Sequence, residues 1–134
     1  MVIITQRITI VKIRRPAKNV NDELQWFGNS IGLFNMRDKD KSMFRIFIEL
    51  LKSTRAKQYL TSDEIADKLQ LSRGTVIHHV NKLMAAGLVV NERNRYLLRV
   101  DNLEELVDEL RTDIARTMDD LKKVAENIDK MLGL

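Results

Sequence analysis

The stretch that most constrains the fold runs from Leu60 to Val90, where two short helical patterns flank a tight turn. Thr61 suits the N-cap of the first helix, and Glu64, three residues later, completes a capping box. Ser72 suits the N-cap of the second helix, and Gly87 stands where a left-handed residue is needed to end it. Two helices joined by a turn of about three or four residues predict a helix-turn-helix.

The apolar residues of this stretch recur at the spacing that gives each helix one buried face. They are Ile65, Ala66, Leu69, Val76, Val80 and Leu83. Residues 88–90 are too few and too β-branched for a third helix, so we expect a strand there.

From Leu71 to Val89 the sequence reads LSRGTVIHHVNKLMAAGLV. This run resembles the recognition helix of winged helix-turn-helix regulators, and the ArsR-like members in particular. The resemblance extends over roughly residues 41–100 and implies a DNA-binding domain. Metal-sensing ArsR proteins often use cysteine ligands, whereas this chain has no cysteine. The two histidines, His78 and His79, are adjacent rather than four residues apart, so we predict no metal site and no cofactor.

If the helix that starts at Ser72 lies in a major groove, its side chains outside the apolar stripe face DNA. Arg73 suits a guanine edge, Asn81 an adenine edge and Ile77 a thymine methyl group. Gly74 permits close approach to the DNA backbone. The predicted DNA-binding residues of this helix are Ser72, Arg73, Gly74, Thr75, Ile77, His78, Asn81 and Lys82.

A β-hairpin is expected next, with strands at 88–90 and 95–100 around a turn at 91–94. The alternation predicts an inward set and an outward set of side chains. The inward set is Tyr96, Leu98 and Val100, and the outward set is Arg95, Leu97 and Arg99. The hairpin is either an ordinary exposed hairpin or a wing that contacts phosphate or the minor groove. Its position after the helix-turn-helix favours the wing, which adds Arg93, Asn94 and Arg95 to the predicted DNA-binding residues.

Residues 1–37 lie outside the resemblance and are interpreted from periodicity alone. A strand is expected from Arg7 to Arg14, and Pro16 stands in a basic cluster of Lys12, Arg14, Arg15 and Lys18. This cluster is either a solvated strand end or a basic arm that reaches the DNA backbone. A helix capped by Asn21 is expected next. Its apolar residues Leu24, Phe27, Ile31 and Phe34 predict core packing or a subunit contact, with an effector pocket near Trp26–Phe34 as the alternative.

Asp38 or Asp40 is expected to begin the first helix of the winged domain, which would fill the core behind the helix-turn-helix. Its apolar face consists of Phe44, Ile46, Phe47, Leu50 and Leu51. A short first strand is expected at 58–60.

The last part of the chain predicts one helix of about 30 residues and about 45 Å, capped by Asp101 with Glu104 closing a capping box. An apolar heptad runs along it, with Thr117 as the polar exception. So long a helix has too little of its own chain to cover this seam. We therefore predict a two-stranded homodimer contact, the alternative being packing on the N-terminal helix of the same chain. The predicted dimer residues are Leu103, Val107, Leu110, Ile114, Leu121, Val124, Ile128 and Met131.

Charge is divided unevenly along the chain. Residues 1–100 contain 18 Lys and Arg and 9 Asp and Glu, a net charge of +9, whereas residues 101–134 contain 5 and 10, a net charge of −5. A basic domain beside an acidic helix suits a protein with one face on a polyanion. No catalytic pair, activated serine or Gly-rich phosphate loop is present, which argues against an enzyme.

No apolar run reaches the ~20 residues of a membrane span. The N-terminus has its apolar residues first and its basic ones last, unlike a signal peptide, so we expect a cytoplasmic, nucleoid-associated protein with no membrane partner.

We therefore predict a mainly α fold with a small β wing (α+β). Residues 1–37 form an extension, 38–100 a winged helix-turn-helix and 101–134 a dimerisation helix. The predicted function is a homodimeric, sequence-specific regulator that binds double-stranded DNA at palindromic half-sites. The alternative is a winged-helix module that binds proteins and not specific DNA.

Overall fold

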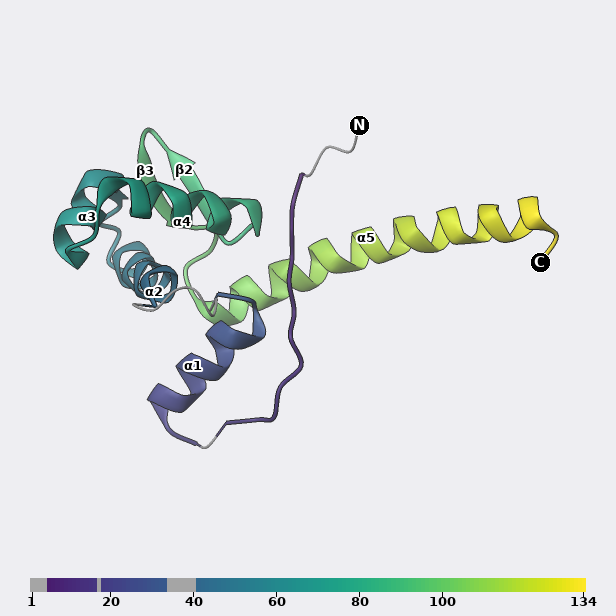
Figure 1. The fold of residues 1–134 in the computed structure, drawn as a ribbon, viewed down its shortest axis with the longest axis horizontal. Coiled ribbons are helices and arrows are strands. Elements are labelled where there is room, and N and C mark those ends of the chain that lie inside the picture. The colour runs from purple at the N-terminus through teal and green to yellow at the C-terminus, as the bar shows by residue number, and fades with distance from the viewer. Residues whose placement is uncertain (1–4, 17, 34–40) are drawn as a thin grey trace. The chain divides into compact units, whose positions relative to one another are not determined.

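The computed structural model describes residues 5–16, 18–33 and 41–134. The chain divides into two compact units, Met1–Asp101 and Asn102–Leu134. The first unit contains α1 (Val20–Ser30), α2 (Ser42–Arg55), β1 (Leu60–Thr61), α3 (Ser62–Leu69), α4 (Arg73–Ala85), β2 (Val89–Glu92) and β3 (Arg95–Leu98) (Figure 1). The second unit is a single helix, α5 (Leu103–Leu132). The predicted fold class, mainly helical with a small antiparallel sheet and a long C-terminal helix, is confirmed.

The three strands form an antiparallel sheet in the order β1-β3-β2. Glu92 pairs with Arg95, so the hairpin turn consists of Arg93 and Asn94 alone. Both turn residues have positive φ angles, 54° and 66°, as the tight turns that match strand twist require. The turn is therefore shorter than the predicted 91–94, because β2 continues to Glu92.

The predicted alternation along the second hairpin strand is wrong at Leu97. Tyr96, Leu97 and Leu98 are all buried. The buried run shows that both faces of β3 are covered, whereas the alternating pattern belongs to a strand with one face in water.

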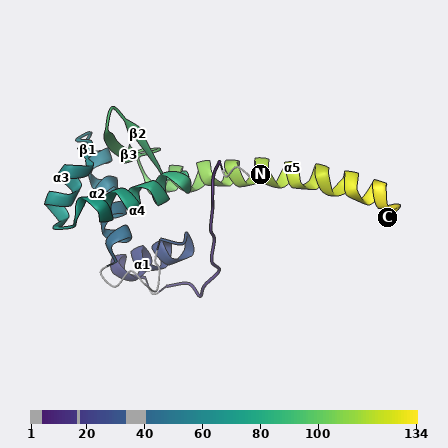
Figure 2. The same ribbon diagram turned by 45° about the horizontal axis from the view of Figure 1, so that its top comes forward.

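The core lies where α2 meets the helix-turn-helix and the sheet. Contacts join α2 to α3, α4 and β3, and Figure 2 shows these elements gathered into one group. Ile46, Phe47 and Leu50 of α2 are fully buried, as the predicted apolar face requires. Burying one such side chain contributes about 1.5–3 kcal/mol. The α4 side of this core is Val76, Val80 and Leu83, all buried.

Polar groups also tie α2 to its neighbours. The Thr54 hydroxyl is buried and accepts a hydrogen bond from the Leu98 backbone N–H at 2.9 Å, which joins the end of α2 to β3. Arg45 donates to the Leu69 carbonyl at 2.8 Å, at the end of α3. The buried N–H of Leu98 needs the Thr54 hydroxyl as its acceptor, because leaving it unpaired costs about 1–3 kcal/mol.

The helix caps of the helix-turn-helix are as predicted. Thr61 and Glu64 form the reciprocal capping box at the start of α3. The Ser72 side chain accepts from the Thr75 backbone N–H at the start of α4. Gly87 has a φ of 81°, in the left-handed region that follows the end of α4.

The predicted strand from Arg7 to Arg14 is wrong, because residues 6–16 belong to no strand. We call residues 5–16 the arm. Its Arg7 N–H donates to the Ala85 carbonyl at 2.7 Å, and its Val11 N–H donates to the Ser30 carbonyl at 2.8 Å. These are isolated bonds to the ends of two helices and not a ladder to a neighbouring strand.

Helix α1 begins two residues earlier and ends sooner than predicted. Asn19, and not Asn21, is the N-cap, and its side chain accepts from the Asp22 N–H. Ile31 already lies beyond the helix, because Gly32 turns the chain with a φ of 73°. The predicted helical residue Phe34 lies outside the described residues. Phe27 stacks on Phe47 with ring centroids 6.4 Å apart, which supports core packing for this helix.

Other predicted boundaries change as well. The strand predicted at 95–100 ends at Leu98. The proposed first residues of α2, Asp38 and Asp40, lie outside the described residues, and α2 follows Lys41. The first strand is Leu60–Thr61 instead of 58–60. The N-cap of α5 is Asn102, whose extended backbone lets its side chain accept from the Glu105 N–H, so the cap predicted at Asp101 is wrong by one residue. Among the described helices, none has both the length and the apolarity of a membrane span.

The bond between Thr54 and β3 gives a stability prediction. Thr54→Val keeps the side-chain shape but leaves the Leu98 N–H buried without its acceptor, so we expect a loss of about 1–3 kcal/mol in the free energy of unfolding. Urea unfolding followed by circular dichroism measures it. Thr54→Ser keeps the hydroxyl and is the matched control, which we expect to lose less. Equal losses in both variants would show that the hydrogen bond contributes nothing.

Candidate nucleic-acid interface

Helix α4 has one continuous exposed face. Gly74, His78, Asn81 and Ala85 are exposed and follow one another at spacings of four, three and four residues, which places them on one side of the helix. Val76, Val80 and Leu83 occupy the opposite, buried side. The caps and the core therefore fix which side of α4 is presented outward.

The remaining predicted residues of α4 lie at the borders of this face. Ser72, Arg73 and Lys82 are exposed, whereas Thr75 and Ile77 are partly buried. The Thr75 hydroxyl lies 2.7 Å from the Ser72 hydroxyl, so both groups also serve the helix cap. The structure thus brings all eight predicted α4 residues to the outer side or its margins.

No neighbouring atom of the described residues requires a glycine at position 74. A Cβ built at this position meets no atom within 4 Å, and its φ is not in the left-handed region. Glycine in a helix is destabilising by as much as about 1 kcal/mol relative to alanine. The fold of this chain alone therefore does not explain the glycine.

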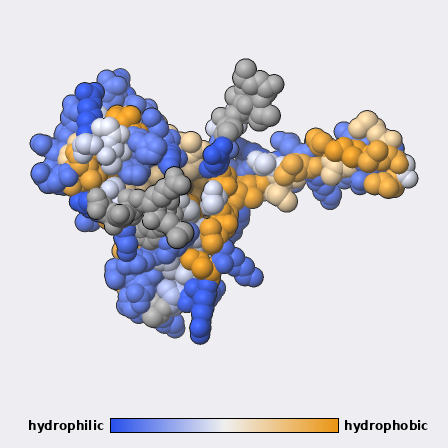
Figure 3. Space-filling model, in the orientation of Figure 1, coloured by the Kyte–Doolittle hydropathy of each residue, from blue (hydrophilic) through white to orange (hydrophobic). Residues whose placement is uncertain are grey.

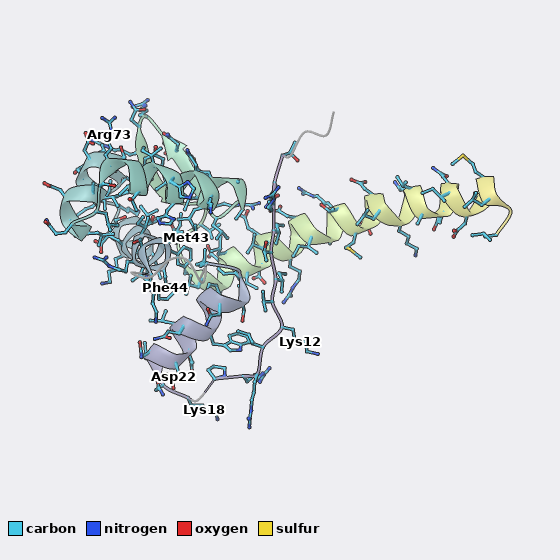
Figure 4. The ribbon with its side chains drawn as sticks, in the orientation of Figure 1. Lys12, Lys18, Asp22, Met43, Phe44 and Arg73 are labelled. Carbon is cyan, nitrogen blue, oxygen red and sulfur yellow. The ribbon has the colours of Figure 1, made fainter. Side chains whose placement is uncertain are left out.

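Arg73 is engaged in an ion pair. Its Nε lies 3.4 Å from the Asp63 carboxylate of α3, and both side chains are 73% exposed. Figure 4 shows Arg73 on the outer side of the molecule at the start of α4. Exposed pairs of this kind contribute only about 0–1 kcal/mol, so Arg73 can exchange its carboxylate for another anion at little cost.

Helix α3 carries more negative charge beside this end of α4. Asp63, Glu64 and Asp67 are exposed, and together with Gln70 and Leu71 they line an open hollow. Of these acidic residues, only Glu64 has a role predicted from the sequence, in the capping box. They lower the positive potential at the N-terminal end of α4.

Glu64 has a lowered pKa. The first cause is the hydrogen bond that its carboxylate accepts from the Thr61 backbone N–H at 3.0 Å, followed by the bond to the Thr61 side chain and the nearby charge of Arg95. Each of these favours the ionised form of the carboxyl group.

The three predicted wing residues fall into two places. Arg93 and Asn94 form the exposed tip of the hairpin. Arg95 is also exposed, but it pairs with Thr61 of β1, and its charge is felt by Glu64. Arg95 therefore lies toward the start of α3, while Arg93 is the cation at the tip.

The arm adds cations that periodicity did not connect with α4. Its Gln6 side chain donates to the Ala86 carbonyl at 3.2 Å, next to the bond between Arg7 and Ala85. These contacts bring Arg7 to the C-terminal end of the exposed face, where Lys82 also lies. No sequence signal indicates this, because isolated bonds to a helix end have no periodicity. Figure 4 shows Lys12 farther along the arm and Lys18 near the start of α1.

A cavity of about 480 Å³ lies between the arm, residues 31–33 and the helices α2 and α4. Arg7 and Lys82 contribute to its lining, as do the apolar side chains of Leu33 and Met43. It overlaps the segment for which an effector pocket was the alternative interpretation, and that pocket stays a prediction.

The second unit presents an apolar seam. Leu121, Val124 and Ile128 of α5 are 58%, 55% and 44% exposed, and Val107 and Met131 are exposed as well. Leu103 and Ile114 are partly buried and Leu110 is buried. Thr117, the polar seam residue, donates its hydroxyl to the Asp113 carbonyl within the helix.

Comparison with known proteins agrees with this architecture. Residues 39–90 match a family model described as winged helix-turn-helix DNA-binding. Together with the three-stranded sheet, this match identifies a winged helix-turn-helix domain of the DNA-binding class within the first unit. The ArsR-like subtype stays a prediction.

The chain is also similar to a solved structure, a GntR family transcriptional regulator from Listeria monocytogenes. The TM-score is 0.37 and the identity 18%, over 75% of this chain and 89% of that one. None of the curated proteins compared with the chain matches it.

The capping box predicts a pH effect. The lowered pKa of Glu64 means that its carboxylate stabilises the folded state above its ordinary pKa of 4.5, and that this stabilisation is lost as the pH falls through the lower folded value. We therefore expect Glu64→Gln to be less stable than the wild type at pH 7, and the two to converge toward pH 3. Urea midpoints at several pH values measure this. A difference that stays constant with pH would contradict the assignment.

Proposed function

We propose that this chain is a DNA-binding transcription regulator that acts as a homodimer and places α4 in the major groove. The observation that carries the proposal is the continuous exposed face of α4 in a domain that matches a DNA-binding winged helix model. A helix presented in this way is the element with which helix-turn-helix domains read bases.

Base recognition would centre on Asn81, which lies in the middle of the exposed face. Its amide suits a bidentate contact to adenine. His78 lies one turn earlier on the same face, and the partly buried Ile77 borders it, in reach of a thymine methyl group. Arg73 would bind guanine or phosphate after leaving Asp63, and this exchange makes its contribution smaller than that of a free arginine.

Phosphate contacts would come from cations around this face instead of from α4 alone. Arg93 and Asn94 at the hairpin tip extend the interface on one side. Lys82 and Arg7 stand at the C-terminal end of α4 on the other. Neither of these two cations forms an ion pair with any of the described residues, so neither has to leave a carboxylate before it binds a phosphate.

The proposed dimer rests on the exposed seam of α5. An apolar heptad over about 30 residues with exposed Leu121, Val124 and Ile128 is the pattern of a coiled-coil contact. Two copies would supply two recognition helices for a site with two-fold symmetry.

A second candidate is a protein-interaction module. The acidic residues Asp63, Glu64 and Asp67 favour it, because they stand beside the N-terminal end of α4 where a DNA backbone would be repelled. A module of this kind would show no salt-dependent retention on duplex DNA.

The test is selection of bound sequences from random duplex DNA, followed by gel-shift titrations at several salt concentrations. We expect a palindromic site, and we expect Arg93→Ala to weaken binding to all sequences and to reduce the salt slope by about one. Lys130→Ala, in the last turn of α5, makes the same charge change and is the matched control. Binding that is absent at low salt, or equal for the two variants, would contradict the assigned face and favour the interaction module.

The substitution Gly74→Ala is expected to affect folding and DNA binding differently. In the free protein, Gly74→Ala meets no clash, so we expect unfolding stability to stay equal or to rise by up to about 1 kcal/mol. If DNA approaches the helix backbone at Gly74, the same methyl group should weaken binding to the selected site. Thermal unfolding and gel shift on one preparation measure both. Unchanged affinity would remove Gly74 from the interface.

A further inference from the structure

The α5 seam has two unlike flanks. Taking Leu121 and Ile128 as the first seam positions of their heptads, one flank consists of Arg111, Met118, Ala125 and Leu132, and it is apolar from Met118 onward. The other flank consists of Asp113, Asp120 and Asn127. All these residues belong to one uninterrupted helix, so their positions follow from its geometry.

The apolar flank is presented to solvent as fully as the seam itself. Met118 is 57% exposed and Leu132 is 69% exposed. Figure 3 shows apolar side chains gathered over the C-terminal half of α5. An exposed apolar surface of this kind, next to a heptad seam, marks a surface that another protein covers.

We propose that α5 pairs with α5 of a second copy in the antiparallel direction. The inference rests on the homodimer of the proposed function and adds the direction of its helices. Parallel pairing sets the flank that follows the seam in one helix against the flank that precedes it in the other. The flank of Asp113, Asp120 and Asn127 would then lie along the apolar flank at both sides of the dimer, and the carboxylates of Asp113 and Asp120 would be held beside Met118 and Ala125.

Antiparallel pairing sets like flanks together. The flanks that carry Met118 and Ala125 meet on one side, where Met118 of each copy packs near Ala125 of the other, while the two polar flanks meet on the other side and stay in water. Repulsion between the carboxylates of the two polar flanks is reduced, because Arg116 and Lys123 lie one turn from Asp120 on the same helix. This segregation of apolar and polar flanks favours the antiparallel direction.

The direction sets the distance between the N-terminal ends of the two α5 helices. Each unit joins α5 at Asn102, the N-terminal end of the helix. If the exposed seam is paired over its length, the midpoint of the dimer lies near residues 119–123. At 1.5 Å per residue the two starts of α5 are then roughly 50–60 Å apart.

The chain has no cysteine, so single labels test the direction directly. Thr112→Cys and Asp119→Cys place a spin label on the outer side of the helix, one heptad apart, at exposed positions. Distances between the two labels of a dimer are measured by double electron–electron resonance on the full chain. In a parallel dimer both positions give the same distance. In the antiparallel dimer we expect the Thr112→Cys distance to be longer by about 10 Å or more, since that label lies farther from the midpoint.

The two proposals fail in different ways. Equal distances at both labels in a dimeric sample would overturn the antiparallel direction and leave the dimer intact. A monomer mass in light scattering, with no coupling between labels, would overturn the dimer of the proposed function. A mass above that of a dimer would overturn two-stranded pairing. Circular dichroism of each labelled chain verifies that α5 remains helical.

Discussion

The packing of α2 against α4 and β3 is the constraint on which the candidate interface depends. Phe47 and its buried neighbours on α2 fill the space behind the helix-turn-helix, and Val80 lies at the centre of the buried side of α4. Because this side is fixed by burial, the opposite side of α4 is fixed as the exposed face. Thr54 extends the same constraint to the sheet through its bond to Leu98, so one helix orients both α4 and the β2–β3 hairpin.

Most of the winged domain could be predicted because its signals are local. The caps at Thr61 and Ser72, the spacing of Val76 and Val80, and the position of Gly87 each depend on residues within a few positions. Local hydrogen bonds and side-chain periodicity suffice for such features. The cap of α5 was misplaced by one residue because Asp101 and Asn102 both suit a cap, and only the backbone conformation distinguishes them.

The rest required the tertiary structure. The arm alternates apolar and polar residues like a strand, yet it forms only isolated bonds to two helix ends. Two of its residues, Gln6 and Arg7, contact the end of α4, which lies about 80 residues later in the sequence. Leu97 is buried along with its neighbours Tyr96 and Leu98, so both faces of β3 are covered, which the local alternation does not reveal. The ion pair between Arg73 and Asp63 likewise arises from the docking of α3 on α4, and it alters the charge of the proposed interface.

The hairpin tip shows how local backbone preference and surface charge compete. Arg93 adopts a positive φ, a conformation that costs an ordinary L-residue roughly 1–2 kcal/mol and that glycine adopts freely. Asn94 tolerates this region better, and its backbone N–H is held by the Asn91 side chain at 3.1 Å. The tip therefore retains a guanidinium at a position where a shorter, more permissive residue would fold more easily. The positive φ of Arg93 therefore lowers the stability of the folded hairpin. Replacing Arg93 by glycine would remove this cost, but it would also remove the positive charge at the tip.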